Sequence, residues 1–338
     1  MGKARTIARR TFLFGSVAIA GGVAFGTYAV KKPHANPLLA GLDPDEVSFN
    51  PWVKVSTEGI TLIAPHADSG QGVTSMQAAL IAEEMDLAWG QFDVEFGRPS
   101  PAYYNTAAAD DLAPFMSHDD GFAAKSVRNV LGGVVKLAGI MVTGGSSSVP
   151  DSFVKLRQAG ANARETLKLA AANLRNVPVS DLDTEDGAVV LPDGSRIDYR
   201  DLAVEAAKTE PATDVPLRAP EEWRLIGHEM PRLDIRAKST GKQSYGIDLK
   251  IDGMKHAAVR TNPRQGGKLV SYDATEALAM PGVEQVLEIS GGIAVIASST
   301  WNAFRAINAI ETEWGPAPYP AEMSSHWSEV SASFTRDR

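Results

Sequence analysis

The chain has 338 residues, enough for about two domains, and its 44% hydrophobic and 22% charged content is ordinary for a globular protein. Its net charge of −8 and the lack of a basic stripe argue against a nucleic-acid-binding surface, so no nucleic-acid partner is expected. The chain has no cysteine, which excludes disulfides, a thiolate nucleophile and a cysteine-ligated iron–sulfur cluster within it.

Residues 1–32 are typical of an export signal or a membrane anchor. Met1 to Arg10 carries four basic residues and no acidic one, and an uncharged, mostly apolar run of 19 residues follows it. Arg9-Arg10-Thr11-Phe12-Leu13 is a twin-arginine pattern, which we favour over a Sec signal that happens to hold two arginines. We therefore expect folded export to the periplasm or to the periplasmic face of the inner membrane. Cleavage of the signal and its retention as an anchor both remain open.

Residues 33–50 are interpreted as a tether, and residues 51–208 as a ligand-binding domain segment. Within that segment, Gly59–Pro65 is an apolar run that predicts a strand. Val73–Ala88 has the apolar stripe of a helix, although Glu84 interrupts it, and Phe92–Phe96 alternates like a half-buried strand. The predicted order is strand, glycine loop, helix, strand.

The rest of this segment is less uniform. Residues 106–142 have no clear period, whereas apolar residues recur every three or four positions from Phe153 to Leu174. A long helix is therefore expected after Pro150, which suits a first helical turn because that position needs no N–H. Hairpin turns are expected at Glu185–Gly187 and Pro192–Gly194.

A second module follows a proline-rich linker at residues 209–231. Residues 232–315 predict a compact α+β unit, and residues 316–338 begin a further part. The expected strands and helices of this unit are Ser244–Leu249, Lys255–Arg260, Asp273–Met280 (helix), Val283–Ile289, Ile293–Ala297, Thr300–Ile310 (helix) and the short run Glu311–Trp314. Trp301, Phe304 and Trp314 are expected to pack the last helix.

Two loops that precede helices form the candidate site. Gly70-Gln71-Gly72-Val73-Thr74 opens the first helix, and Gly145-Ser146-Ser147-Ser148 opens the long one. A helix N-terminus offers unpaired N–H groups and positive potential, and glycine lets an anion approach closely. Serine and threonine hydroxyls add donors, and the Gln71 amide offers both a donor and an acceptor. Each loop alone is also explained as a simple cap, but two together predict a site for a phosphate-bearing ligand.

Neither loop matches a standard nucleotide-binding pattern, since the GxxxxGK[ST] and GxGxxG spacings are absent. Other polar residues receive structural interpretations. His66 and His118 are lone histidines with no second ligand at metal spacing. Glu83 and Glu84, like the acids at 119–120, are expected to be solvated or capping. No catalytic residue and no metal ligand is assigned.

Several motifs recur in a fixed order along residues 45–315. They are Gly59-Ile60-Thr61, Asp68–Thr74, Ala82-Glu83-Glu84, Pro101–Asn105, Thr143–Val149, Pro231–Asp234, Lys238, Gly241, Tyr245–Asp248 and Gly253-Met254. In this order they resemble the large molybdenum-binding subunit of the xanthine dehydrogenase family. The nearest resemblance is to the isoquinoline 1-oxidoreductase beta subunit and related aldehyde dehydrogenases.

The resemblance implies an α+β fold, in which a molybdopterin-binding segment is followed by a hammerhead-like domain at residues 232–315. It implies a molybdopterin cofactor, usually the cytosine dinucleotide in bacteria, with molybdenum. The implied reaction hydroxylates an N-heterocycle or an aldehyde with water. Electrons would leave through a small partner subunit that holds the [2Fe-2S] clusters, and then reach an acceptor such as a cytochrome. The implied cofactor-binding residues are Gly70, Gln71, Gly72, Thr74, Thr143, Gly144, Gly145, Ser146, Ser147 and Ser148.

Family members are much longer than this chain, and the resemblance places their catalytic glutamate in later segments. We therefore expect an N-terminal part of the catalytic subunit that is inactive by itself. The alternative is an exported, non-catalytic ligand-binding or interaction module.

Overall fold

The computed structural model describes residues 28–116 and 118–334. The chain divides into two compact units, the first ending at Gln243 and the second starting at Ser244. The predicted export signal therefore lies almost wholly outside the described residues. Within these residues, no helix combines the length and the apolar character that a membrane crossing requires.

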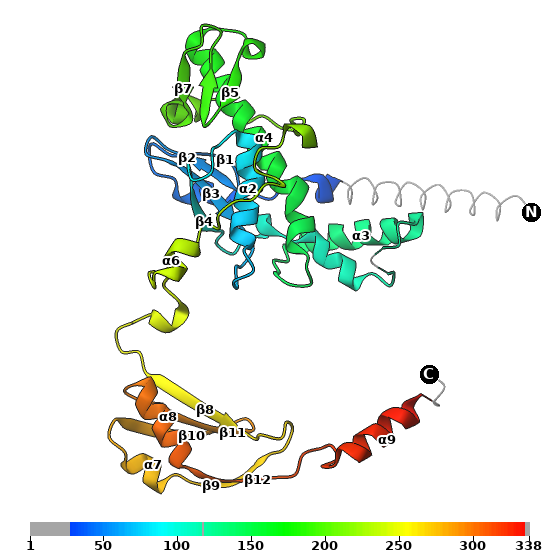
Figure 1. Cartoon of the computed structure of the whole chain (residues 1–338), viewed down its shortest axis with the longest axis vertical. Helices are drawn as coiled ribbons and strands as arrows, with labels where there is room; N and C mark the ends of the chain where they lie inside the picture. Colours follow the sequence, from blue (N-terminus) through cyan, green and yellow to red (C-terminus); the bar gives the residue numbers. More distant parts are fainter. Residues whose placement is uncertain (1–27, 117, 335–338) are drawn as a thin grey trace, which may run out of the picture. The chain divides into compact units, whose positions relative to one another are not determined.

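The first sheet positions the glycine loop. Strands β1 (Val47–Asn50), β2 (Val53–Val55), β3 (Ile60–Ala64) and β4 (Asp93–Phe96) lie side by side in that order (Figure 1). The first three pair antiparallel, whereas β3 and β4 are parallel and are joined by the crossover helix α2 (Val73–Met85). The predicted strand, loop, helix, strand order is confirmed. The loop thus follows the carboxyl end of a parallel strand, where open α/β sheets bind ligands.

The prediction that Phe92–Phe96 forms a half-buried strand is confirmed at Phe92 and Val94 and is wrong at Phe96. Strand β4 is an edge strand, and Phe96 is 61% exposed. Only Val94 within the strand packs against the core. The alternation of apolar and acidic residues could not reveal that this strand lies at the edge of its sheet.

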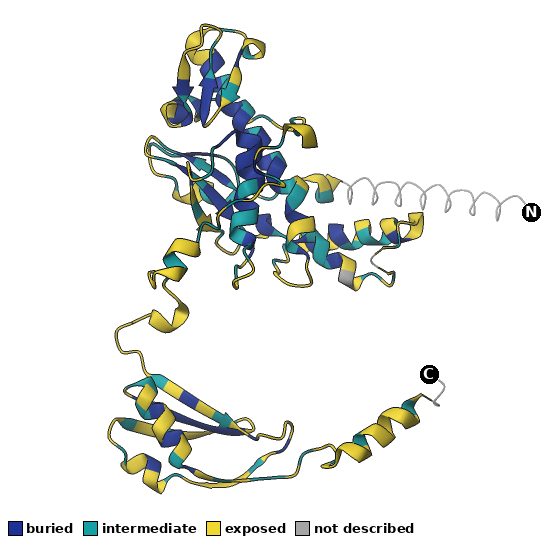
Figure 2. Ribbon diagram, viewed as in Figure 1, coloured by how far each residue is buried: buried dark blue, intermediate teal, exposed yellow. Residues whose placement is uncertain are grey.

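The long helix α4 (Ser148–Arg175) packs on α2, and both helices contribute buried residues to the core of the first unit (Figures 1 and 2). The predicted helix is confirmed, although it begins before Pro150. Gly160 allows the close approach, because a Cβ atom there would lie 2.4 Å from the Ile81 carbonyl oxygen. Leu174, at the end of the predicted stripe, is exposed.

Residues 106–142, which showed no clear period, contain a 3-10 segment (Thr106–Leu112) and the helix α3 (Phe122–Ala138). Paired glycines at 132 and 133 disfavour a helix locally. Both are buried, and Gly132 packs against Thr106, from which a Cβ atom would be 3.6 Å away, an ordinary van der Waals contact. Tertiary packing therefore makes a helix that local propensity does not indicate.

A small antiparallel sheet completes the first unit. It consists of β5 (Asp183–Glu185), β6 (Ala188–Val190) and β7 (Arg196–Asp198), so both predicted hairpin turns are confirmed. The short helices α5 (Ala203–Ala206) and α6 (Ile235–Ser239) follow.

The second unit contains two antiparallel groups of strands. Its elements are β8 (His256–Thr261), β9 (Leu269–Asp273), α7 (Thr275–Ala279), β10 (Val283–Ile289), β11 (Gly292–Ala297), α8 (Thr300–Ala309), β12 (Glu311–Trp314) and α9 (Met323–Ser333). The strand order is β10-β11-β8 in one sheet, and β12 pairs with β9 in the other. A small core forms where α8 covers the three-stranded sheet.

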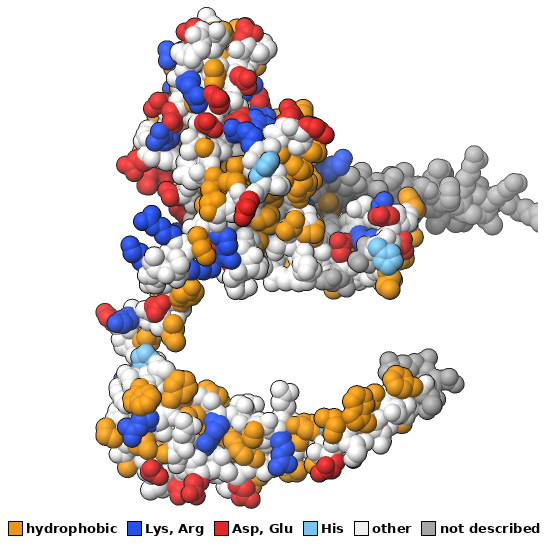
Figure 3. All heavy atoms as spheres, viewed as in Figure 1, with side chains coloured by type: hydrophobic (Ala, Val, Ile, Leu, Met, Phe, Trp, Pro, Cys, Tyr) orange, Lys and Arg blue, Asp and Glu red, His pale blue; other side chains and the backbone are white. Residues whose placement is uncertain are grey.

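Two expectations for this unit are wrong. Ser244–Leu249 is no strand, because Gly246–Asp248 forms a 3-10 turn in which an Asp248 carboxylate oxygen accepts from the Tyr245 N–H. Trp301 and Phe304 do not pack α8 against the sheet, since they are 71% and 55% exposed. The side of α8 that faces the core carries Ala303, Ala306 and Ile307. Strand β9 and helix α9 were not predicted. Hydrophobic side chains gather along α9 (Figure 3).

Candidate functional site

The loop that opens α2 (residues 66–72) depends on its glycines. Gly70 and Gly72 have φ angles of 108° and 86°, which side chains with a Cβ rarely adopt. Gly72 is the N-cap of α2 and has no side chain to satisfy the helix donors. Asp68, four positions before Gly72, supplies the missing acceptor for these N–H groups.

Asp68 caps the helix from within the loop. Its carboxylate accepts from the Gly70 N–H at 2.8 Å and from the Thr74 N–H at 3.2 Å. The side chain is only 5% exposed. Burial by itself raises the pKa of Asp68, but the N–H groups of Gly70, Thr74 and Gly72 outweigh it, so the pKa lies below its ordinary value. An internal anion therefore occupies the α2 terminus.

Gln71 is tied to its own loop. Its Oε1 accepts from the Ser69 N–H at 2.7 Å and from the Ser69 hydroxyl at 3.2 Å, and its Nε2 donates to the Ala67 carbonyl at 3.0 Å. One amide N–H therefore remains for a ligand, rather than the whole amide that the sequence suggested.

The loop that opens α4 (residues 143–148) leaves more donors unused. Ser147 is buried, donates to the Gly144 carbonyl at 2.6 Å and accepts from Asn105 at 2.8 Å, so it shapes the turn. Gly145 and Ser146 both have φ angles of 57°. Within the described residues, the hydroxyls of Ser146 and Ser148 have no hydrogen-bond partner. These two hydroxyls are the available ones.

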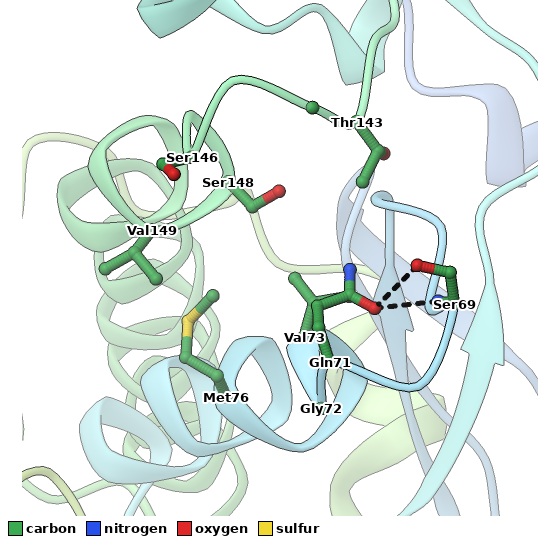
Figure 4. A pocket seen from close by; sticks show the side chains of 10 residues that line it. Ser69, Gln71, Gly72, Val73, Met76, Thr143, Ser146, Ser148 and Val149 are labelled. Carbon is green, nitrogen blue, oxygen red and sulfur yellow. Dashed lines mark hydrogen bonds between the residues drawn. The ribbon is translucent and has the colours of Figure 1, made fainter.

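The two loops meet. The Thr143 hydroxyl oxygen accepts from the Ala67 N–H at 3.0 Å, which ties one loop to the other. Between them lies a cavity of about 420 Å³ (Figure 4). Its lining residues are Ser69, Gln71, Gly72, Val73, Met76, Thr143, Gly144, Ser146, Ser148 and Val149.

Six of the ten predicted site residues thus line one cavity: Gln71, Gly72, Thr143, Gly144, Ser146 and Ser148. The other four, Gly70, Thr74, Gly145 and Ser147, hold the loops without lining it. Ser69, Val73, Met76 and Val149 were not predicted as site residues. Val73 and Met76 carried a signal, because their spacing of three puts them on one helix face, but that face was interpreted as core.

The cavity has a polar and an apolar side. Ser148 points its hydroxyl toward it, while Val73, Met76 and Val149 form an apolar side (Figure 4). No lining residue is charged. The arrangement can bind a flat apolar group and a hydrogen-bonding or anionic group together, with the anion held by hydroxyls, N–H groups and a helix terminus.

A second hollow of about 590 Å³ lies beside the first and shares Thr143 with it. His66, at its edge, is buried, and its Nε2 lies 3.4 Å from an Asp151 carboxylate oxygen. Lys155 binds the same carboxylate at 2.8 Å. Burial by itself raises the pKa of Asp151, but His66 and Lys155 beside it outweigh that effect, so the pKa stays below its ordinary value. His66 is thus no isolated histidine, and the contact links the two loops.

The segment Arg218–Asp234, which we call the return segment, runs back along α2. Near its end, Arg232 donates to the Gly70 carbonyl at 2.8 Å and pairs with Asp234 at 2.7 Å. The Leu233 N–H donates to Ser75 at 3.0 Å. Residues 218–231 of this segment were interpreted as linker, yet they bind the carboxylate of Glu83, and Arg232 and Leu233, which had been assigned to the second module, hold the glycine loop and α2.

Glu83 and Glu84 are not solvated, contrary to expectation, because both are fully buried. A Glu83 carboxylate oxygen accepts from the Leu225 N–H at 2.6 Å and the Ile226 N–H at 2.9 Å. Glu84 pairs with Arg157 at 2.7 Å. Their partners make them anchors of the return segment and of α4. His118 is exposed, and no cluster of three metal-binding side chains exists among the described residues.

Comparison with known proteins gives homologues over most of the chain, although no family model matches. A membrane-bound aldehyde dehydrogenase [pyrroloquinoline-quinone] of Gluconacetobacter polyoxogenes is 30% identical over 92% of this chain. A nicotinate dehydrogenase subunit of Pseudomonas putida is 28% identical over 84% of it, and the beta subunit of isoquinoline 1-oxidoreductase of Brevundimonas diminuta is 26% identical over 92%.

The matched part is a minority of each relative, covering 38%, 22% and 41% of their lengths. Among solved structures, quinoline 2-oxidoreductase from Pseudomonas putida 86 is 26% identical over 28% of this chain and 16% of its own. Its TM-score of 0.23 marks a local likeness only. Over most of its length, the chain is thus similar to large and beta subunits of molybdopterin oxidoreductases, as its sequence resemblance indicated.

Proposed function

We propose that this chain supplies part of the cofactor site of a molybdenum-dependent oxidoreductase that oxidises an aldehyde or an N-heterocycle with water. The observation that carries the proposal is the single cavity between the two predicted loops. The homologues support the reaction class, because their names describe aldehyde, nicotinate and isoquinoline oxidation.

The residues present fit a molybdopterin dinucleotide. The hydroxyls of Thr143, Ser146 and Ser148 would offer donors to phosphate oxygens, and the remaining Gln71 N–H would be available to an acceptor on a heterocycle. Val73 and Met76 give an apolar surface for a flat ring. When bound, the cofactor supplies the redox centre at which the substrate is oxidised. This chain's residues bind and orient it, and none of them is assigned a proton-transfer role.

The finer features are part of the same proposal. The cytosine form of the dinucleotide, a small [2Fe-2S] partner subunit and a further acceptor such as a cytochrome follow the family resemblance. A hammerhead-like role for residues 232–315 and export by the twin-arginine route are proposed likewise. The absence of cysteine from this chain is compatible with clusters in a partner.

Analysis of the bound cofactor tests the proposal. The protein would be produced with its assembly factors and partner subunit, and its molybdenum, pterin and nucleotide content measured. We expect molybdenum and a pterin dinucleotide in similar amounts. Pyrroloquinoline quinone in their place would overturn the proposal and match the name of the Gluconacetobacter relative. Neither cofactor in fully matured protein would favour the non-catalytic binding module.

Gln71→Ala gives a second test on the same preparation. Loss of one amide contact is expected to lower cofactor occupancy, and unchanged molybdenum content would remove Gln71 from the site. Leu278→Ala, an exposed residue in the second unit, is the control. Reading the open reading frame past Arg338 is a cheaper check, since the proposal expects further cofactor-binding segments there.

A further inference from the structure

The outward side of helix α3 is apolar, which is the reverse of an ordinary surface helix. Val130, Val134 and Leu137 follow one another at spacings of four and three, so they form one stripe. They are 67%, 57% and 52% exposed. The helix packs through its other side, where Gly132 contacts Thr106. An exposed aliphatic stripe of this kind is typical of a surface that binds another apolar surface.

The charged side chains of α3 lie away from the stripe. At 100° per residue, Lys125, Arg128 and Lys136 are each more than about 120° from its midline. Lys125 pairs with Asp120 at 3.5 Å, and Arg128 donates to the Asp119 carbonyl at 2.6 Å. The stripe itself is therefore uncharged, which favours an apolar cover over an acidic or a basic partner.

The apolar run Phe12–Val30 reaches the fold beside this stripe. Its last residue packs on Gly133, where a Cβ atom would lie only 3.3 Å from a Val30 methyl group. A few residues later, the His34 Nε2 lies 2.8 Å from the Lys136 carbonyl oxygen. Gly133 and Lys136 are the sequence neighbours of two stripe residues. The end of the run is thus tied to α3 next to the stripe.

The residues at this junction are of the kinds found at membrane surfaces. Tyr28 is 63% exposed, and Lys31 and Lys32 directly after the run are exposed as well. Tyrosine rings and lysine ammonium groups favour the level of the lipid headgroups. As a helix, a run of this length would extend about 28 Å, close to the roughly 30 Å of a bilayer's hydrocarbon core. A bilayer spanned by the run would therefore end level with α3.

We propose that the stripe Val130, Val134 and Leu137 is a membrane-docking surface, which lies at the boundary of lipid headgroups and acyl chains while Phe12–Val30 spans the bilayer. Helices that bind in this way bury their apolar side by about 5–10 Å. The spanning run holds the first unit at the membrane, and α3 adds a second contact that fixes its orientation there. This arrangement requires that the run is retained, and it does not involve the cofactor.

Spin labels test the arrangement, because the chain has no cysteine and a single one can be introduced. Val134→Cys and Leu137→Cys would be labelled in the full chain and inserted into vesicles of phosphatidylethanolamine and phosphatidylglycerol. Val154→Cys on α4, where Val154 is 60% exposed, is the matched control. The ratio of accessibility to oxygen over that to a polar nickel chelate should be at least about threefold higher at the stripe, since acyl chains exclude polar solutes.

Equal ratios at the stripe and at the control would overturn the proposal, because the stripe would then face water. Labels shielded from both reagents would also overturn it, since protein rather than lipid would cover the stripe. Val130→Cys is the third position, to be used if either stripe variant fails to fold. N-terminal sequencing of the protein isolated from cells is an independent check. A chain that begins after Val30 would contradict the arrangement, whereas neither result bears on the cofactor analysis.

Discussion

Both ends of α2 have buried carboxylates, but the carboxylates at the two ends bind different kinds of partner. At the carboxyl end, Glu83 and Glu84 are fully buried and bind arginines and backbone N–H groups of distant segments. At the amino end, the Asp68 carboxylate accepts its hydrogen bonds from its own loop and helix turn, and Arg232 of the return segment lies 3.9 Å away. The first end joins α2 to α4 and to the return segment. The second shapes one wall of a cavity. The hydrogen-bond partners of these three acidic residues therefore give each of them a structural role.

The largest loss of stability is expected from a substitution at the carboxyl end of α2. Glu84→Gln leaves Arg157 and Arg164 buried without their carboxylate, which should destabilise the α2–α4 pair by about 3–5 kcal/mol. Hydrogen exchange of α2 and α4 amides measures this loss within the first unit. Glu329→Gln on exposed α9 is the control. A loss below about 1 kcal/mol would contradict the anchoring role.

The helix contact itself should be nearly as sensitive. A Cβ atom at Gly160 meets the Ile81 carbonyl oxygen at 2.4 Å, so Gly160→Ala should cost about 1–3 kcal/mol despite the better helix propensity of alanine. Gly132→Ala in α3 is a matched control, because its nearest contact would be 3.6 Å away. If the amides of α2 and α4 were equally protected from hydrogen exchange in Gly160→Ala and Gly132→Ala, the two helices would be able to move apart at little cost in stability.

A smaller effect is expected at the amino end. Asp68→Ala removes the acceptor for two N–H groups and should cost about 0.5–2 kcal/mol, as the loss of an N-cap does. The loss should be confined to the loop and the first turn of α2. Faster exchange that extends through α4 would show that Asp68 anchors more than its loop and would weaken the contrast between the two ends.

The pH dependence near the amino end has a defined sign. Asp234 accepts a hydrogen bond from the Arg232 side chain, and this bond lowers the pKa of Asp234 to about 2 from an ordinary value of 3.8. A depressed pKa means that the pair stabilises the fold above pH 3.8 and that this contribution is lost as the pH falls toward 2. Carboxyl ¹³C shifts measured against pH follow it directly. A midpoint at the ordinary value would mean that the pair does not persist in solution.

The smallest effect is expected in the second unit. Trp301 and Phe304 are exposed, so Trp301→Ser and Phe304→Ser should each change stability by no more than about 0.5 kcal/mol. Thermal unfolding of the full chain checks this. A drop of several degrees would imply that these rings are covered in solution.

Much of the fold near the site could be predicted. Gly59–Pro65, Val73–Ala88 and the long helix carry strong periods, and the paired loops were placed correctly before their helices. Helix α3 could not be predicted, because its adjacent glycines disfavour a helix locally and their burial is known only from the tertiary structure. The exposure of Trp301 and Phe304 was also hidden, since an aromatic side chain alone does not say which helix face meets the sheet.

The sequence by itself determined that two glycine loops precede helices and which hydroxyls and amide they carry. Only the tertiary structure decided which of those groups are available. Asp68, Gln71 and Ser147 use their hydrogen-bonding capacity within the loops, whereas Ser146 and Ser148 keep theirs. The physical reason is that a donor serves a ligand only if no nearer acceptor satisfies it. That depends on distances between residues such as Ala67 and Thr143, 76 positions apart in the chain.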